Sequence, residues 1–179
     1  MMMRTITKYF ITIIALVCAV GGTLYWYGTN LPALHRDDAA VDVKNATYEI
    51  QEKSVTLVNG SSIVQDTPSS QTVTAYFGNE ARGDLDNDGD EDVAFILIQN
   101  GGGSGTFVYV VAALLTPGGY VGTNGILLGD RIAPQTTEVR NGQVIVNFAD
   151  RRPDEPMTTQ PSIGITLRAR IEAGRLVIQ

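Results

Sequence analysis

The chain has 179 residues and carries 19 acidic and 13 basic side chains, which gives a formal net charge of −6. This length allows one ordinary domain together with an N-terminal segment. An acidic chain without a basic stripe is a poor partner for nucleic acid, and its single cysteine cannot form a disulfide within the chain.

Residues 1–28 are predicted to form a membrane anchor or a signal peptide. Arg4 and Lys8 come first, and no charged residue then appears before position 35. The apolar stretch after Lys8, closed by the aromatic residues 25–27, is about long enough to span a hydrocarbon core of roughly 30 Å. Positive charge before it predicts a cytoplasmic N-terminus and a domain outside the membrane, held by one transmembrane helix. The alternative is a signal peptide cleaved near residues 19–21, which would leave the domain periplasmic or secreted.

Residues 29–44 are predicted to be a stalk or linker because they show no clear period, and a folded domain is expected over 45–179. Its apolar residues alternate or form short runs, which is typical of strands. Asn59-Gly60 and Asn141-Gly142 are strong hairpin-turn dipeptides. Without a convincing amphipathic helix after residue 30, the sequence predicts an all-β antiparallel sandwich or barrel of short strands. The expected strands are 46–50, 55–58, 61–65, 72–77, 93–98, 106–115, 126–128, 136–140, 143–148, 163–171 and 176–178.

The most informative segment is 84–92, which reads D-L-D-N-D-G-D-E-D. Six acidic side chains in nine residues repel one another strongly unless a cation lies among them. The D-x-D-x-D-G-x-x-D spacing offers oxygen atoms at every second residue, and calcium takes about 6–8 oxygen ligands. Gly89 permits the sharp turn that such a loop needs. The expected calcium ligands are the carboxylates of Asp84, Asp86, Asp88 and Asp92 and the backbone carbonyl of Asp90.

Two alternatives to a calcium site stay open at this point. The segment can be a solvated acidic turn without a metal, or it can bind magnesium, which demands stricter octahedral geometry. Zinc and copper are disfavoured because the segment offers no nitrogen or sulfur ligand. An EF-hand is disfavoured too. Its loop needs a bidentate glutamate at position 12, which is Phe95 here, and the flanking residues favour strands.

The acidic segment resembles the FG-GAP calcium loop of integrin α-subunits, and Phe77-Gly78 upstream fits the FG of that motif. Only one copy is present, so a propeller of several blades is not implied. The order of five segments is similar to that of a group of uncharacterised bacterial envelope proteins. That resemblance implies an exported, membrane-associated protein of the bacterial cell envelope, and it implies no activity. The five segments are 76–80, 84–92, 101–107, 128–131 and 154–157.

The sequence offers little for catalysis, and an enzyme is not expected. The only histidine, His35, lies in the predicted stalk, so a serine–histidine or cysteine–histidine site in the domain is excluded. The glycines of 101–105 are not followed by the lysine of a P-loop, which argues against nucleotide binding.

The favoured hypothesis is a membrane-tethered, extracytoplasmic calcium-binding domain in which the metal orders a hairpin loop. An adhesion or carbohydrate-binding module is the first alternative, with Tyr109 and Tyr120 as candidate contacts, and the sequence does not decide between a protein and a carbohydrate partner. The second alternative is an envelope hydrolase that uses carboxylates of the Asp150-Glu155 loop, with Asp130-Arg131 approaching it.

Overall fold

The computed structural model describes residues 42–179. The expectations for 1–28, and for the linker before Asp42, fall outside the described residues. Within residues 42–179 the chain is all-β with antiparallel sheets, as predicted. No helix of the described part is long and apolar enough to cross a membrane. The elements are η2 (Val43–Asn45, a 3-10 helix), β1 (Thr47–Ile50), β2 (Lys53–Thr56), β3 (Ser61–Thr67), β4 (Ser70–Gly83), β5 (Asp92–Asn100), β6 (Phe107–Thr116), β7 (Gly119–Gly122), β8 (Ile126–Asp130), β9 (Ala133–Arg140), β10 (Gln143–Asp150), β11 (Ile163–Glu172) and β12 (Arg175–Ile178).

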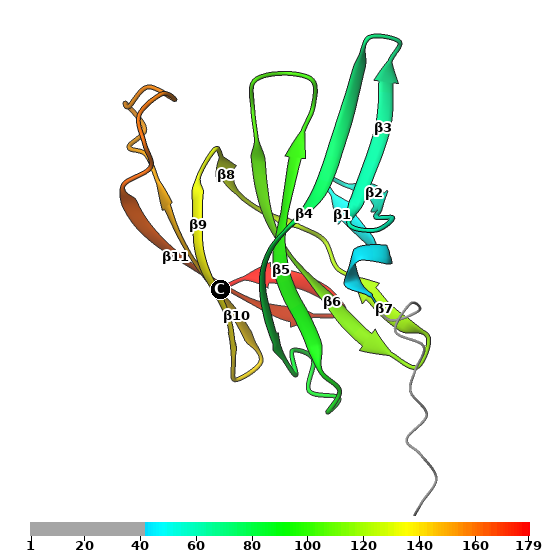
Figure 1. The fold of residues 1–179 in the computed structure, drawn as a ribbon. Helices are drawn as coiled ribbons and strands as arrows, with labels where there is room; N and C mark the ends of the chain where they lie inside the picture. Colours follow the sequence, from blue (N-terminus) through cyan, green and yellow to red (C-terminus); the bar gives the residue numbers. More distant parts are fainter. Residues whose placement is uncertain (1–41) are drawn as a thin grey trace, which may run out of the picture. The chain divides into compact units, whose positions relative to one another are not determined.

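The strands form two open sheets and one separate hairpin (Figure 1). The larger sheet has the order β3-β4-β5-β6-β7, and β8 also pairs with β6. The smaller sheet has the order β12-β11-β10-β9, and β1 and β2 form a two-stranded sheet. In residues 42–179 no pairing joins β3 to β7 or β8, so the larger sheet does not close on itself. The arrangement is a sandwich of antiparallel sheets.

The central strands β5 and β6 are buried on both faces. On β5, Ala94 and Ile96 belong to the core shared with the smaller sheet, whereas Phe95 and Leu97 belong to a second core under the β1–β2 hairpin. Successive side chains of a strand point to opposite faces, so a strand covered on both sides needs apolar residues at every position. This explains why 93–98 and 106–115 read as continuous apolar runs.

The β1–β2 hairpin lies directly on the larger sheet. Glu49 connects it to the chain after β7, because its amide donates to the Thr123 carbonyl (3.1 Å) and its carbonyl accepts from the Gly125 amide (2.8 Å). A Cβ atom at Gly122 would lie 2.3 Å from the Thr47 carbonyl oxygen, so the two segments approach too closely for any side chain there. Val43 is also buried, and the packed fold thus begins before the expected boundary at residue 45.

Both asparagine–glycine dipeptides form tight turns with positive φ values. Asn141-Gly142 joins β9 to β10 as predicted. Across Asn59-Gly60, however, β2 and β3 are not paired, and an isolated bridge between Val58 and Ser61 is formed instead. The reason is that β2 pairs with β1 instead, through a turn at Gln51 and Glu52 that contains no glycine. The polar segment 66–71, which separates the expected strands 61–65 and 72–77, extends the β3–β4 hairpin, since Thr67 pairs with Ser70.

Candidate metal centre

The acidic segment forms the loop of a β-hairpin, as the sequence predicts. β4 ends at Gly83 and β5 begins at Asp92, and these two residues are paired across the strands. Upstream, Phe77-Gly78 lies at a register shift of β4, and the Phe77 side chain is half-exposed. The loop therefore connects two paired strands, and the pairing of Gly83 with Asp92 holds its ends together.

Three of the predicted ligands come together in this loop. One carboxylate oxygen from each of Asp84, Asp86 and Asp88 lies within 4.8 Å of the other two, and all three residues are exposed. The group consists of oxygen donors only, which suits a hard cation such as calcium and offers nothing to zinc or copper. The three aspartates could therefore hold a metal ion.

Backbone amides fold the loop around the carboxylate of Asp84. Its Oδ1 accepts a hydrogen bond from the amide of Asn87 (2.7 Å), and its Oδ2 accepts one from the amide of Gly89 (3.2 Å). Gly89 has φ of +90°, a left-handed conformation that glycine adopts at little steric cost. In turn, Asp88 accepts from the amide of Asp90 (2.8 Å). The chain therefore curls so that alternate carboxylates face the same small volume.

Asp92 occupies a different environment from the other predicted ligands. It has no exposed surface. Its Oδ2 accepts from the amide of Leu85 (2.8 Å), and its Oδ1 accepts from the amide of Leu115 on β6 (2.8 Å). The carboxylate thus ties the start of the loop to a neighbouring strand. Its role as a metal ligand, and that of the Asp90 carbonyl, stay predictions.

One apolar residue anchors the acidic loop in the protein core. Leu85, between two of the clustered aspartates, is 2% exposed and packs in the core that the two sheets share. The hydroxyl of Tyr120 on β7 donates to the carbonyl of Glu91 in the loop (3.4 Å). Arg82 pairs with the Glu91 side chain (3.5 Å), an exposed ion pair that contributes little to stability.

Burial and mutual repulsion make two of these carboxyl groups harder to ionise. Desolvation raises the pKa of Asp86, and the carboxylates of Asp92, Asp88 and Asp84 raise it further. Desolvation also raises the pKa of Asp92, although the amide hydrogen bonds from Leu115 and Leu85 act in the opposite direction. A cation among the aspartates would relieve this repulsion.

We expect the metal-free protein to lose stability with rising pH through Asp86. A carboxyl group whose pKa is higher in the folded state binds protons more tightly there, so its stabilising contribution is complete below its ordinary pKa of 3.8 and is lost as the pH rises through the raised value. The free energy of unfolding of the wild type, relative to that of Asp86→Asn, should therefore fall as the pH rises above 3.8. Urea denaturation in the presence of a chelator measures this difference, and a flat or rising difference would contradict the expectation.

A second acidic cluster involves the Asp150-Glu155 loop, the loop considered above for an envelope hydrolase. Asp130, Asp150 and Glu155 line a surface hollow of about 300 Å³, so the Asp130 region does approach the 150–155 loop. The hydrogen-bonded guanidinium of Arg131 holds the pKa of Asp130 below its usual value, which makes this carboxyl group a poor proton donor. Glu155 accepts from the amide of Arg152 (2.9 Å). Arginines thus pair with Asp130 and Glu155, and the lowered pKa of Asp130 is the opposite of what a general acid requires.

Tyr109, predicted as a contact for an adhesion partner, is not available for that role. Its side chain is 1% exposed in the core beneath the β1–β2 hairpin, and its hydroxyl accepts from Gln51 (3.0 Å).

His35 lies outside the described residues. Comparisons with family models, with curated proteins and with solved structures gave no match.

Proposed function

We propose that residues 42–179 form a calcium-binding β domain without catalytic activity, tethered by the N-terminal segment in the bacterial cell envelope and exposed outside the inner membrane. The observation that carries this proposal is the convergence of the Asp84, Asp86 and Asp88 carboxylates in the β4–β5 loop. The chemistry of this donor set favours calcium over magnesium, since calcium accepts irregular oxygen geometry and magnesium requires near-ideal octahedral geometry.

The proposed role of the metal is structural. Calcium bound to Asp84 and Asp86 would restrain the backbone on both sides of Leu85, the residue that carries the loop into the shared core. The metal would therefore stabilise the contact between the loop and the smaller sheet. A ligand that binds only the folded state adds about 1.4 kcal/mol of stability at ten times its Kd.

Calorimetric titration of the purified full-length chain with calcium, after treatment with a chelator, tests the proposal. We expect saturable binding and a raised midpoint of thermal unfolding, and we expect both to be lost in Asp86→Asn and Asp88→Asn. Glu138→Gln is the matched control, because Glu138 is a carboxylate of β9 outside the cluster. A parallel titration with magnesium distinguishes the two cations.

Absence of binding heat and of any thermal shift in the wild type would mean that the loop is a solvated acidic turn. Equal responses in the wild type and in both aspartate variants would place the metal elsewhere. Tighter binding of magnesium than of calcium would overturn the choice of cation.

The tether is tested separately, by alkaline extraction of membranes from cells that express the full chain. An uncleaved anchor keeps the protein in the membrane fraction, and a cleaved signal peptide releases it. N-terminal sequencing of the mature protein then shows whether residues 1–28 are still attached.

A further inference from the structure

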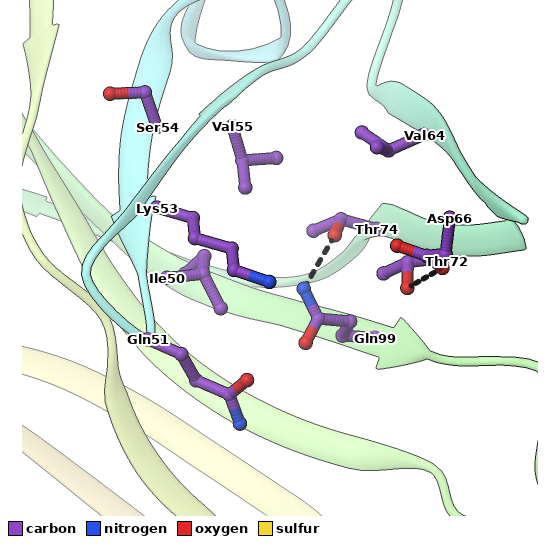
Figure 2. Close-up of a pocket in the computed structure, with 10 residues that line it drawn as sticks. All are labelled: Ile50, Gln51, Lys53, Ser54, Val55, Val64, Asp66, Thr72, Thr74 and Gln99. Atoms are coloured by element: carbon purple, nitrogen blue, oxygen red, sulfur yellow. Dashed lines mark hydrogen bonds between the residues drawn. The ribbon is translucent and has the colours of Figure 1, made fainter.

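A small pocket lies where the β1–β2 hairpin ends and the face of the larger sheet emerges from beneath it. Its volume is about 150 Å³, and its lining comes from β1, β2, β3, β4, β5 and the Gln51 turn (Figure 2). The acidic loop joins the end of β4 to the start of β5, whereas this pocket uses Thr74 near the start of β4 and Gln99 near the end of β5. The two sites therefore use opposite ends of the same strands.

The floor of the pocket is formed by polar residues on the same face of the larger sheet that is apolar beneath the β1–β2 hairpin. Phe95 and Leu97 are buried on this face, and alternation along β5 places Gln99 on the same face. There the Gln99 amide donates to the hydroxyl of Thr74 (3.0 Å), its cross-strand partner. Thr74 is only 2% exposed. The pocket floor is thus a hydrogen-bonded polar pair in which Thr74 is buried and Gln99 is partly buried.

Opposite charges face this pocket without pairing. Lys53 extends from β2 toward the Thr74–Gln99 pair, and Asp66 lies on β3 at the other side (Figure 2). Within residues 42–179 neither side chain forms an ion pair. Asp66 is held in place because its Oδ2 accepts from the Thr72 hydroxyl (2.7 Å). The pocket therefore presents one ammonium and one carboxylate, separated from each other.

We propose that this pocket binds a small zwitterion with an aliphatic side chain, of the chemistry of an aliphatic α-amino acid. The ligand carboxylate pairs with Lys53, and the ligand ammonium pairs with Asp66. A ligand with a single charge pairs with one of these groups and repels the other. The aliphatic part lies against Ile50, Val55 and Val64, which also line the pocket.

Size and lining restrict the ligand further. A cavity of about 150 Å³ accommodates a molecule of the size of benzene, so this pocket has room for a small amino acid such as valine. Among residues 42–179 no aromatic ring lines the pocket, so a sugar would find no ring there on which to stack.

Saturation-transfer difference NMR on the purified full-length chain tests the proposal with L-valine as the probe. N-acetylvaline lacks the ammonium and valinamide lacks the carboxylate, so each is expected to bind at least tenfold more weakly than L-valine. Lys53→Met and Asp66→Asn are each expected to weaken L-valine binding at least tenfold. Lys44→Met is the matched control, because Lys44 lies over the ring of Tyr76, 4.6 Å from its centroid, and is expected to leave binding unchanged.

The comparison of ligands on the wild type stays informative even if a variant folds poorly. No saturable signal from L-valine in the wild type overturns the proposal. If N-acetylvaline or valinamide binds the wild type as tightly as L-valine does, the proposed pairing of both ligand charges is wrong. The same conclusion follows if a folded Lys53→Met or Asp66→Asn protein binds L-valine as tightly as the wild type. Each titration is run with calcium and with chelator. L-valine binding is expected in both, so failure of the calcium site leaves this test intact.

Discussion

Replacing Asp92 with alanine is expected to destabilise the metal-free protein by about 2–6 kcal/mol, because a buried donor left without its acceptor costs about 1–3 kcal/mol and two donors lose theirs. These are the amides of Leu85 and Leu115, each 2.8 Å from an Asp92 oxygen. The carboxylate itself is fully buried, so water does not replace it freely. Urea denaturation in the presence of a chelator, followed by circular dichroism, measures the loss.

Asp90→Ala is the control for this experiment. Asp90 is an exposed residue of the same loop, and a surface substitution of this kind usually changes stability by less than about 0.5 kcal/mol. Asp92→Asn should give an intermediate loss, since its amide keeps one oxygen acceptor and turns a donor toward the second N–H group. If Asp92→Ala is as stable as the wild type without metal and differs only with calcium, then Asp92 acts chiefly as a ligand.

Replacing Phe95 with alanine is expected to cost about 3–5 kcal/mol, the usual range for removing a buried aromatic side chain. Phe95 has no exposed surface. Its ring meets Tyr48 edge-on with centroids 5.4 Å apart and lies 5.3 Å from the ring of Tyr76. It therefore joins the central strand β5 to the β1–β2 hairpin and to β4. The midpoint of urea denaturation should fall without a change in its slope.

Phe77→Ala provides the matched control because the Phe77 side chain is 50% exposed and leaves no cavity of comparable size. A loss for Phe95→Ala no larger than that for Phe77→Ala would mean that the hairpin does not form a tightly packed layer on the larger sheet. Loss of the hairpin alone would appear as a separate early transition in denaturation.

Two residues fix the acidic loop to the two sheets. Asp92 fixes the base of the loop to β6, and Leu85 holds its first turn in the shared core. The three clustered aspartates lie on the exposed side of these anchors. Under the proposed function, calcium binds a loop whose ends are already placed, and this preorganisation reduces the entropy that binding must overcome.

Much of the local structure could be predicted because it depends on neighbouring residues. The Asn141-Gly142 dipeptide favours the positive φ values of a tight turn, and the β9–β10 hairpin forms there. The spacing of aspartates around Gly89 predicts a loop between strands, which the β4–β5 hairpin confirms. The expected hairpin at Asn59-Gly60 did not form as such, because pairing with β1 competes for β2 and no local signal reveals that competition.

By itself, the sequence determined the all-β class, several turns and the convergence of three aspartates, since each depends on contacts between residues close in the chain. Only the tertiary structure separated Asp92 from the other aspartates, because its second partner, Leu115, lies 23 residues away. Likewise, the apolar runs of β5 and β6 indicate that both faces of these strands are buried. They do not indicate that the β1–β2 hairpin covers one face and the smaller sheet covers the other. The pairing of strands that are distant in the sequence decides these features, and it depends on which whole face of each strand is buried.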